Sequence, residues 1–292
     1  MSGIPAPSLP LATCPFGGRS FATLELQYEP GSRSLWMYYR EDGTRHFSME
    51  MLDDIAQVRD MVVDLHLAHA ERDPPVRYFV MASRMPGVFN LGGDLSMFAE
   101  AVRTDDRERL RGYAHACVDL VHGLTTAFGL RMVTVSVVNG RALGGGLEAA
   151  LAEDFIIASP TAQMGVPEVA FNSFPGMGAI SLLSRRLGAA RAERLISSGA
   201  VFSGAEMYDF GVVDILAPDE DAEGFARTWL GEDEARFDRR YSLACARRTL
   251  FPVSRDELMR ITDMWVDCSC SVSANDVRHM ERLAAAQRRI LG

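Results

Sequence analysis

Residues Met132–Ala179 read MVTVSVVNGRALGGGLEAALAEDFIIASPTAQMGVPEVAFNSFPGMGA and hold the features that decide the fold. The apolar run Val133–Val138 predicts a buried strand, which the turn-forming pair Asn139-Gly140 ends. Gly144-Gly145-Gly146 then leads into LEAALA, which predicts a helix from Gly146 to Glu153. Glycine backbone at a helix N-terminus offers free N–H groups and the positive end of the helix dipole, so this turn favours an anion.

Two glutamates, Glu148 and Glu168, stand in apolar surroundings within this segment. Glu148 lies among alanine and leucine in the predicted helix, and Glu168 follows Pro167 in the otherwise uncharged loop Met164–Pro175. A glutamate on a helix is usually a surface residue. Apolar neighbours favour burial instead, and a buried carboxylate needs either a partner or a chemical role. We therefore predict both glutamates as catalytic candidates.

Strand and helix patterns alternate through the first two thirds of the chain. The strands begin with a hairpin, and a long amphipathic helix follows it. The predicted strands are Phe21–Tyr28, Ser34–Tyr39, Val76–Ala82, Met132–Val138 and Asp154–Ala158, and the predicted helices between them are Ser48–Ala70, a largely helical Asp94–Phe128, and Gly146–Glu153. Repeated strand-strand-helix units of this kind predict a parallel sheet with helical crossovers.

Helices dominate the chain after Ala179. They are Ile180–Leu187, Ala190–Ser198, Ser203–Phe210, Phe225–Leu230, Ala235–Leu250, Arg255–Val266 and Ser273–Ile290, with one short strand at Val212–Leu216. We divide the chain into a flexible N-terminal arm at 1–20, an α/β core at 21–217 and a helical C-terminal region at 218–292.

The composition excludes several classes of function. A net charge of -9 argues against general affinity for nucleic acid or anionic membranes, and the absence of a long apolar run argues against a membrane span. The five cysteines are an odd number without zinc spacing, which predicts free thiols in a reducing, cytoplasmic setting. All 30 basic residues are arginine, so lysine Schiff bases and Walker lysines are excluded. We predict no metal and no cofactor.

A second glycine loop follows the strand Val76–Ala82. The loop reads Phe89-Asn-Leu-Gly-Gly-Asp-Leu95. It places Gly93 at the carboxyl edge of the predicted parallel sheet, where Gly145 is also expected. If the N–H groups of Gly93 and Gly145 converge on one point, they form an oxyanion hole that polarises a thioester carbonyl. The alternative is that these glycines only permit tight strand-to-helix turns, and the sequence leaves both interpretations open.

Three motifs in this order, VFNLGGDL, NGRALGGGLEAAL and MGVPEVAFNSFPGMGA, resemble the crotonase (enoyl-CoA hydratase/isomerase) superfamily. The resemblance is closest to the diffusible-signal-factor synthases, which make cis-2-unsaturated fatty acid signals for quorum sensing. Many crotonases have an alanine before the first-loop aspartate and a lysine soon after it. Here Gly93 precedes Asp94, and Ser96-Met97 follow. This departure favours the signal synthases over housekeeping hydratases.

The resemblance implies a fold, an assembly and a reaction. It implies an α/β crotonase-like spiral of strand-strand-helix repeats with a helical C-terminal region, assembled as a homotrimer or a dimer of trimers. It assigns Glu148 and Glu168 as the acid/base pair and Gly93 and Gly145 as the oxyanion donors. The implied reaction is dehydration of a 3-hydroxyacyl thioester, followed by hydrolysis of the thioester. It also implies that Leu143, Met177, Trp265 and Leu283 line the acyl pocket.

The implied substrate is carried by acyl carrier protein or by coenzyme A. Carrier proteins are acidic, so a local positive patch is needed on this acidic chain. We expect that patch at Arg185, Arg186, Arg191 and Arg194, which flank a turn between two predicted helices. Two alternatives stay open: an ordinary enoyl-CoA hydratase or isomerase, and a regulatory binding partner of a signalling kinase.

Overall fold

The computed structural model describes residues 16, 19–231 and 234–289. The predicted flexible arm at 1–20 therefore lies almost wholly outside the described residues. Phe16 is described, and it is buried in the hydrophobic core.

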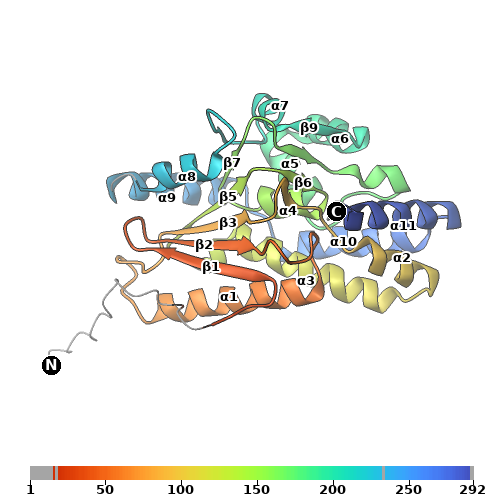
Figure 1. Ribbon diagram of the computed structural model, residues 1–292, viewed down its shortest axis with the longest axis horizontal. Coiled ribbons are helices and arrows are strands. Elements are labelled where there is room, and N and C mark those ends of the chain that lie inside the picture. The colour runs from red at the N-terminus through yellow and green to blue at the C-terminus, as the bar shows by residue number, and fades with distance from the viewer. Residues whose placement is uncertain (1–15, 17–18, 232–233, 290–292) are drawn as a thin grey trace.

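A six-stranded sheet in the order β1-β2-β3-β5-β7-β10 forms the centre of the fold (Figure 1). Its strands are β1 Leu24–Glu29, β2 Ser34–Tyr39, β3 Tyr78–Ser83, β5 Val133–Val138, β7 Phe155–Ala158 and β10 Ile215–Leu216. β1 and β2 form an antiparallel hairpin, and every later neighbour pair is parallel. The predicted hairpin and parallel sheet are therefore confirmed. Every residue of β2 and β5 is buried, because helices cover both faces of the sheet.

Eleven α-helices and two short 3-10 helices surround the sheets in the described part of the chain. They are α1 Met49–Leu67, α2 Leu95–Arg103, α3 Arg107–Thr125, η1 Ala127–Gly129, α4 Gly145–Leu151, η2 Pro167–Phe171, α5 Ala179–Leu187, α6 Ala189–Ser198, α7 Gly204–Phe210, α8 Ala222–Leu230, α9 Glu234–Leu250, α10 Arg255–Cys270 and α11 Ala274–Arg289. The segment predicted as largely helical, Asp94–Phe128, is divided because Asp105 adopts a positive φ of 51° and Asp106 caps the N-terminus of α3.

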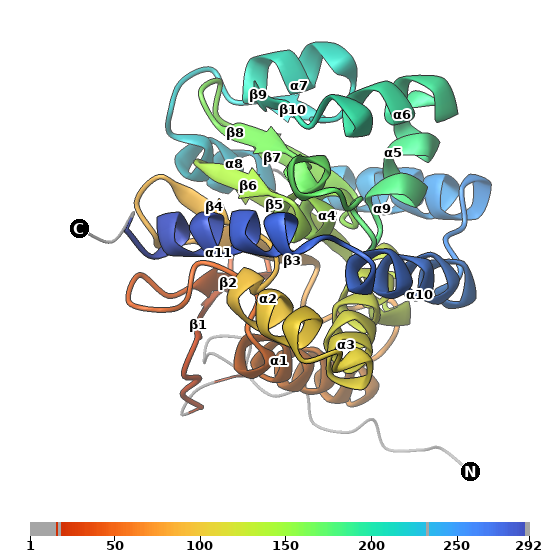
Figure 2. The same ribbon diagram turned by 90° about the vertical axis from the view of Figure 1, so that its right-hand side faces the viewer.

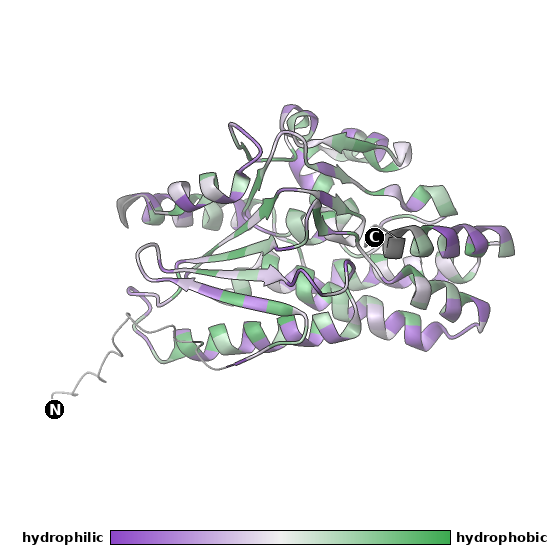
Figure 3. Ribbon diagram, viewed as in Figure 1, coloured by the Kyte–Doolittle hydropathy of each residue, from purple (hydrophilic) through white to green (hydrophobic). Residues whose placement is uncertain are grey.

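The alternation of side chains along β2 assigns each helix layer to one face of the sheet. Leu35, Met37 and Tyr39 point into a core that includes α1, whereas Trp36 and Tyr38 point into a second core that includes α8. In Figure 3 the edge strand β1 alternates between hydrophobic and hydrophilic residues, whereas the inner strands are mostly hydrophobic. The first part of the helical C-terminal region thus packs directly on the core sheet.

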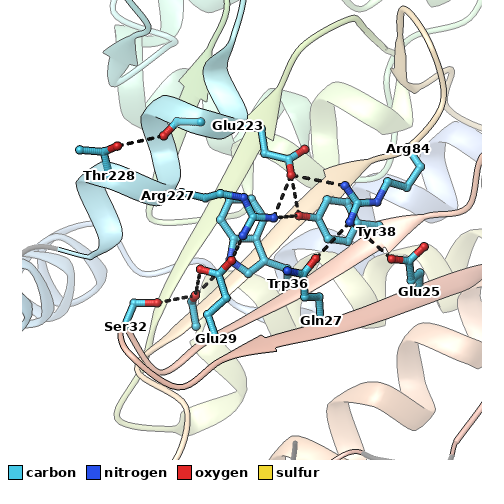
Figure 4. A network of polar contacts seen from close by, with 12 residues as sticks. Glu25, Gln27, Glu29, Ser32, Trp36, Tyr38, Arg84, Glu223, Arg227 and Thr228 are labelled. Atoms are coloured by element: carbon cyan, nitrogen blue, oxygen red, sulfur yellow. Dashed lines mark hydrogen bonds and ion pairs between the residues drawn. The ribbon is translucent and has the colours of Figure 1, made fainter.

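A polar network ties α8 to the sheet beside the second core (Figure 4). The Tyr38 hydroxyl donates to Glu223 Oε1 at 2.9 Å, and Arg227 Nη2 donates to that same Oε1, also at 2.9 Å. The Arg227 guanidinium also lies over the Trp36 ring, 4.3 Å from its centroid. Because these charges are paired and the guanidinium is stacked on a ring, they fix the position of α8 on β2.

A second, four-stranded sheet was not predicted from the sequence. It has the order β4-β6-β8-β9, with the three-residue strands Val88–Asn90, Arg141–Leu143, Gln163–Gly165 and Val201–Ser203. Strands of three residues are too short to show a period of two, so no alternation pattern marks them. The sequence patterns therefore predicted the main sheet but not the second one, and the loops described below follow the strands of this second sheet.

The last two helices pack against α2 and α3 at the end of the molecule that faces the viewer in Figure 2. α10 packs on α3, and α11 lies beside α2 and η2. Helix α11 therefore lies next to the loops of the second sheet. Of the helices that the structure describes, none combines the length and the apolar character that crossing a membrane requires.

Candidate active site

The second sheet brings three loops together at one edge. β4, β6 and β8 are neighbours and run parallel, so their carboxyl ends lie side by side. Gly93 follows the end of β4, Gly145 follows the end of β6, and Glu168 follows the end of β8. Parallel pairing of short strands therefore converts three distant positions of the sequence into one site.

The two glycine loops touch each other. A Cβ atom placed on Gly145 would lie 3.6 Å from the Gly93 nitrogen, and one placed on Gly92 would lie 2.9 Å from the Gly145 nitrogen. Neither the Gly93 N–H nor the Gly145 N–H donates a hydrogen bond to another described residue. The pair is therefore available to a carbonyl oxygen, as an oxyanion hole requires.

Gly144 allows the tight turn from β6 into α4. Its φ is +52°, and a Cβ atom there would lie 2.5 Å from Glu168 Oε1. Any side chain at this position would therefore be strained and would also displace the Glu168 carboxyl.

Glu148 is held at the beginning of α5. The side chain is 2% exposed, and its Oε1 accepts hydrogen bonds from the N–H groups of Met177 and Ala179, both at 3.0 Å. Burial raises the pKa of Glu148, while the bonds from Ala179 and Met177 oppose that rise because they stabilise the carboxylate. One carboxyl oxygen is thus fixed by the backbone, as expected of a preorganised group.

Glu168 has the opposite environment. Its Oε2 atom is buried and has no hydrogen-bond partner among the described residues, although the residue as a whole is only half-buried. Burial and the negative charge of Glu148 raise the pKa of Glu168 to about 8. Because Glu148 accepts two N–H bonds and Glu168 Oε2 accepts none, a single proton shared by the pair resides on Glu168.

One cavity of about 230 Å³ contains all the predicted site residues. Its walls also include apolar side chains from α2 and η2, and Phe98 packs edge-on against Trp265 with ring centroids 5.1 Å apart. The predicted residues lining it are Gly93, Leu143, Gly145, Glu148, Glu168, Met177, Trp265 and Leu283. Two buried carboxyls, two free N–H groups and an apolar wall therefore meet in one place.

Sequence reasoning missed Arg45, which lies beside the first glycine loop. Its carbonyl accepts from Leu91 N–H at 2.7 Å. The Nε and Nη1 atoms of its guanidinium are buried and lack a hydrogen-bond partner among the described residues. The residue as a whole is only half-buried, and it does not line the cavity that holds the predicted site residues. No sequence pattern marks it, because it stands in a polar turn among other charged residues.

The predicted patch of four arginines was wrong for two of them. Arg185 binds the Glu257 carboxylate at 2.8 Å and the Pro252 carbonyl, and Arg186 binds Asp214 at 2.9 Å. Both guanidinium groups therefore hold the fold together. Arg191 and Arg194 are exposed on α6 and form no ion pair with another described residue.

Two free N–H groups beside two carboxyls are the arrangement expected of a class of enzymes that polarise a carbonyl group and move protons next to it. Residues 47–235 match the enoyl-CoA hydratase/isomerase family model. The chain belongs to the enoyl-CoA hydratase/isomerase family.

A relative in sequence agrees with this family, and solved structures share the fold. The enoyl-CoA isomerase/hydratase fer4 of Mycosarcoma maydis is 32% identical over 180 residues, which are 61% of this chain and 63% of that relative. Among solved structures, enoyl-CoA hydratase from Bacillus halodurans superposes with a TM-score of 0.71 at 17% identity, over 89% of this chain and 100% of that one. Human mitochondrial delta3-delta2-enoyl-CoA isomerase superposes with a TM-score of 0.68 at 23% identity, over 90% and 99%.

Proposed function

We propose that this protein dehydrates a 3-hydroxyacyl thioester and then hydrolyses the thioester, releasing a cis-2-unsaturated fatty acid that serves as a quorum-sensing signal. The observation that carries the proposal is the single cavity in which Glu148 and Glu168 face the free N–H groups of Gly93 and Gly145. The closeness of the sequence motifs to the signal synthases supports the identity of the product.

The dehydration uses both carboxyls. The thioester carbonyl accepts hydrogen bonds from Gly93 and Gly145, which makes the α-proton more acidic. Dehydration begins with Glu168 ionised and Glu148 neutral, so the proton that Glu168 holds in the free enzyme first passes to Glu148. Glu168 then removes the α-proton, and Glu148 protonates the departing β-hydroxyl, which leaves as water. The products are a 2-enoyl thioester, a neutral Glu168 and an ionised Glu148.

Hydrolysis follows from the protonation state that dehydration leaves. Ionised Glu148 takes a proton from a water molecule as that water attacks the thioester carbon, and the N–H groups of Gly93 and Gly145 hold the resulting oxyanion. Collapse of the intermediate breaks the carbon–sulfur bond, and the thiolate takes the proton back from Glu148. The free acid is then released.

A second candidate is addition of water to a 2-enoyl thioester, as in an ordinary enoyl-CoA hydratase. This direction needs Glu168 protonated and Glu148 ionised at the start. The raised pKa of Glu168 and the two N–H bonds to Glu148 favour that arrangement in the free enzyme.

The carrier is proposed to be acyl carrier protein, with coenzyme A as the alternative. Both present the acyl thioester on a phosphopantetheine arm. A homotrimer or dimer of trimers, and binding to a signalling kinase, stay predictions.

Mass spectrometry of the products from 3-hydroxydodecanoyl acyl carrier protein tests the proposal. We expect free dodecenoic acid among the products. Enoyl thioester without free acid would favour the hydratase alternative, and the absence of any alkene with either carrier would contradict both functions.

Leu283→Trp is expected to shift preference toward shorter acyl chains. The cavity of about 230 Å³ is smaller than the roughly 300–1,000 Å³ usual for ligand sites, so a long chain must extend along the half-buried Leu283. Losing the contacts of two methylenes costs about 1.6 kcal/mol, which is roughly 15-fold in kcat/KM. The ratio of kcat/KM between twelve-carbon and six-carbon substrates measures this.

Met264→Trp is the matched control, because Met264 is 63% exposed on the neighbouring helix α10. It should leave the ratio unchanged. If Leu283→Trp slows all chain lengths equally and also lowers the melting temperature, Leu283 is core and the acyl chain runs elsewhere.

Reversing Arg191 and Arg194 to glutamate is expected to raise the KM for an acyl carrier protein substrate on the order of 10-fold at low salt. Both arginines line a surface hollow of about 370 Å³. Their helix packs on η2, which carries Glu168. A short N-acetylcysteamine thioester should be used at the wild-type rate, because it lacks the carrier's acidic surface.

Reversal of Arg59 and Arg72, on α1 and in the loop after it, provides the same change of charge at another surface. Equal loss on the carrier-bound and the short substrate after the Arg191 and Arg194 reversal would show that these arginines do not act by docking the carrier.

A further inference from the structure

We infer that Tyr113 is a positioning residue that holds the Gly93 N–H in place as an oxyanion donor. This inference rests on the proposed function, because it assumes that Gly93 binds the thioester carbonyl. Tyr113 lies on α3, and no sequence motif points to it.

The Tyr113 hydroxyl connects the two backbone segments that flank Gly93. It donates to the Phe47 carbonyl at 2.7 Å and accepts from the Asp94 N–H at 3.3 Å. Phe47 N–H in turn donates to the Gly92 carbonyl at 2.8 Å, and Phe47 and Gly93 form an isolated parallel bridge. The residues before and after Gly93 are therefore both tied to the short segment at Phe47, one directly and one through the hydroxyl.

Packing of Tyr113 against Phe98 of the neighbouring helix α2 adds a second constraint. The Phe98 ring stands edge-on to the Tyr113 ring, with centroids 5.2 Å apart. A Cβ atom on Gly93 would lie only 2.5 Å from Phe98 Cζ, so the loop backbone rests directly on that ring. Tyr113 thus supports Gly93 both by hydrogen bonds and through Phe98.

The Tyr113 hydroxyl suits this role because it stays neutral. The side chain is 2% exposed, and burial raises the pKa of Tyr113 well above its ordinary value. A neutral phenol donates and accepts at the same time, as the bonds to Phe47 and Asp94 require. The cavity side of Gly93 stays free, because the Tyr113 hydroxyl bonds to the peptide groups of Phe47 and Asp94 and not to the Gly93 N–H.

A Tyr113→Phe variant tests the inference. It keeps the ring and removes the hydroxyl, so the Gly93 N–H is still present but is less firmly aimed. A displacement of an ångström in a reacting group can cost about 100-fold, and we expect kcat to fall by roughly 10- to 100-fold with little change in KM. The expected signature is a kcat loss with substrate binding retained.

Tyr28→Phe is the matched control. Tyr28 is also a buried tyrosine, and its hydroxyl donates to the Pro75 carbonyl at 2.9 Å, away from the cavity. Its removal should lower the melting temperature by a similar amount and leave kcat unchanged. If Tyr113→Phe likewise changes only the melting temperature, the hydroxyl has a structural role alone and the inference is wrong.

Infrared difference spectroscopy of a bound, ¹³C-labelled thioester carbonyl tests the oxyanion hole and the role of Tyr113 separately. In the wild-type protein the carbonyl band should move to lower frequency, and in Tyr113→Phe this shift should be smaller. No shift in the wild type would contradict the oxyanion hole itself, and therefore the proposed function. The full shift in both proteins would contradict only the role of Tyr113.

Discussion

Glu168→Gln is expected to lower alkene formation by about 10²- to 10⁴-fold, the usual loss when a general acid or base is removed. Glu148 is the other carboxyl among the described residues that line this cavity, and it is assigned to the β-hydroxyl and is tied to Met177 and Ala179. Hydrolysis of a 2-enoyl thioester supplied directly should be much less affected, because Glu148 performs that step. Initial rates on both substrates measure the difference.

The melting temperature of Glu168→Gln, followed against pH, is the folding control. The pKa of Glu168 is raised from 4.5 to about 8 in the folded protein, so the folded state binds this proton more tightly than the unfolded chain. The stability of the wild type should therefore fall from this cause as the pH rises from 4.5 to about 8. The melting temperature of the variant should therefore rise relative to that of the wild type across this pH range. Wild-type alkene formation by the folded variant would remove Glu168 from the mechanism.

Glu148→Gln is expected to abolish both steps while the protein stays folded. The glutamine amide oxygen can still accept from Met177 and Ala179, but the amide can neither protonate the β-hydroxyl nor activate water. Losses of about 10²- to 10⁴-fold are expected in dehydration and in hydrolysis alike.

Glu148→Ala should lose stability in addition, because the N–H groups of Met177 and Ala179 then lack a partner in a buried site. An unsatisfied buried donor costs about 1–3 kcal/mol. Thermal unfolding of the two variants checks the difference. Retained hydrolysis in Glu148→Gln would contradict its assignment as the hydrolytic base, and equal melting temperatures would contradict its anchoring by the backbone.

The patterns of the sequence predicted the main sheet, and the resemblance to a known family predicted the grouping of the site residues. Val133–Val138 and the segments on either side of it have strong patterns, because buried strands and amphipathic helices demand them. Gly93 and Gly145 were predictable as neighbours because both loops follow strands and precede helices. The structure places them in contact across one cavity.

The sequence did not reveal features that depend on tertiary pairing. The strands of the second sheet have three residues each, and their pairing is set by the loops and helices around them. Arg185 and Arg186 look like surface charges in the sequence, yet Glu257 and Asp214 approach them from distant segments. Arg45 and Tyr113 stand in no motif, and their importance comes only from the atoms that surround them.

The central claim is that Glu168 moves the α-proton of a thioester whose carbonyl lies between Gly93 and Gly145. The most direct test is mass spectrometry after incubation with a 3-hydroxyacyl thioester that carries two deuterium atoms at the α-carbon. The account predicts that the wild-type protein forms an alkene that keeps one of the two deuterium atoms, and that Glu168→Gln returns the substrate with both. Alkene formation by Glu168→Gln at the wild-type rate, or recovery of fully labelled substrate from the wild type, would contradict it.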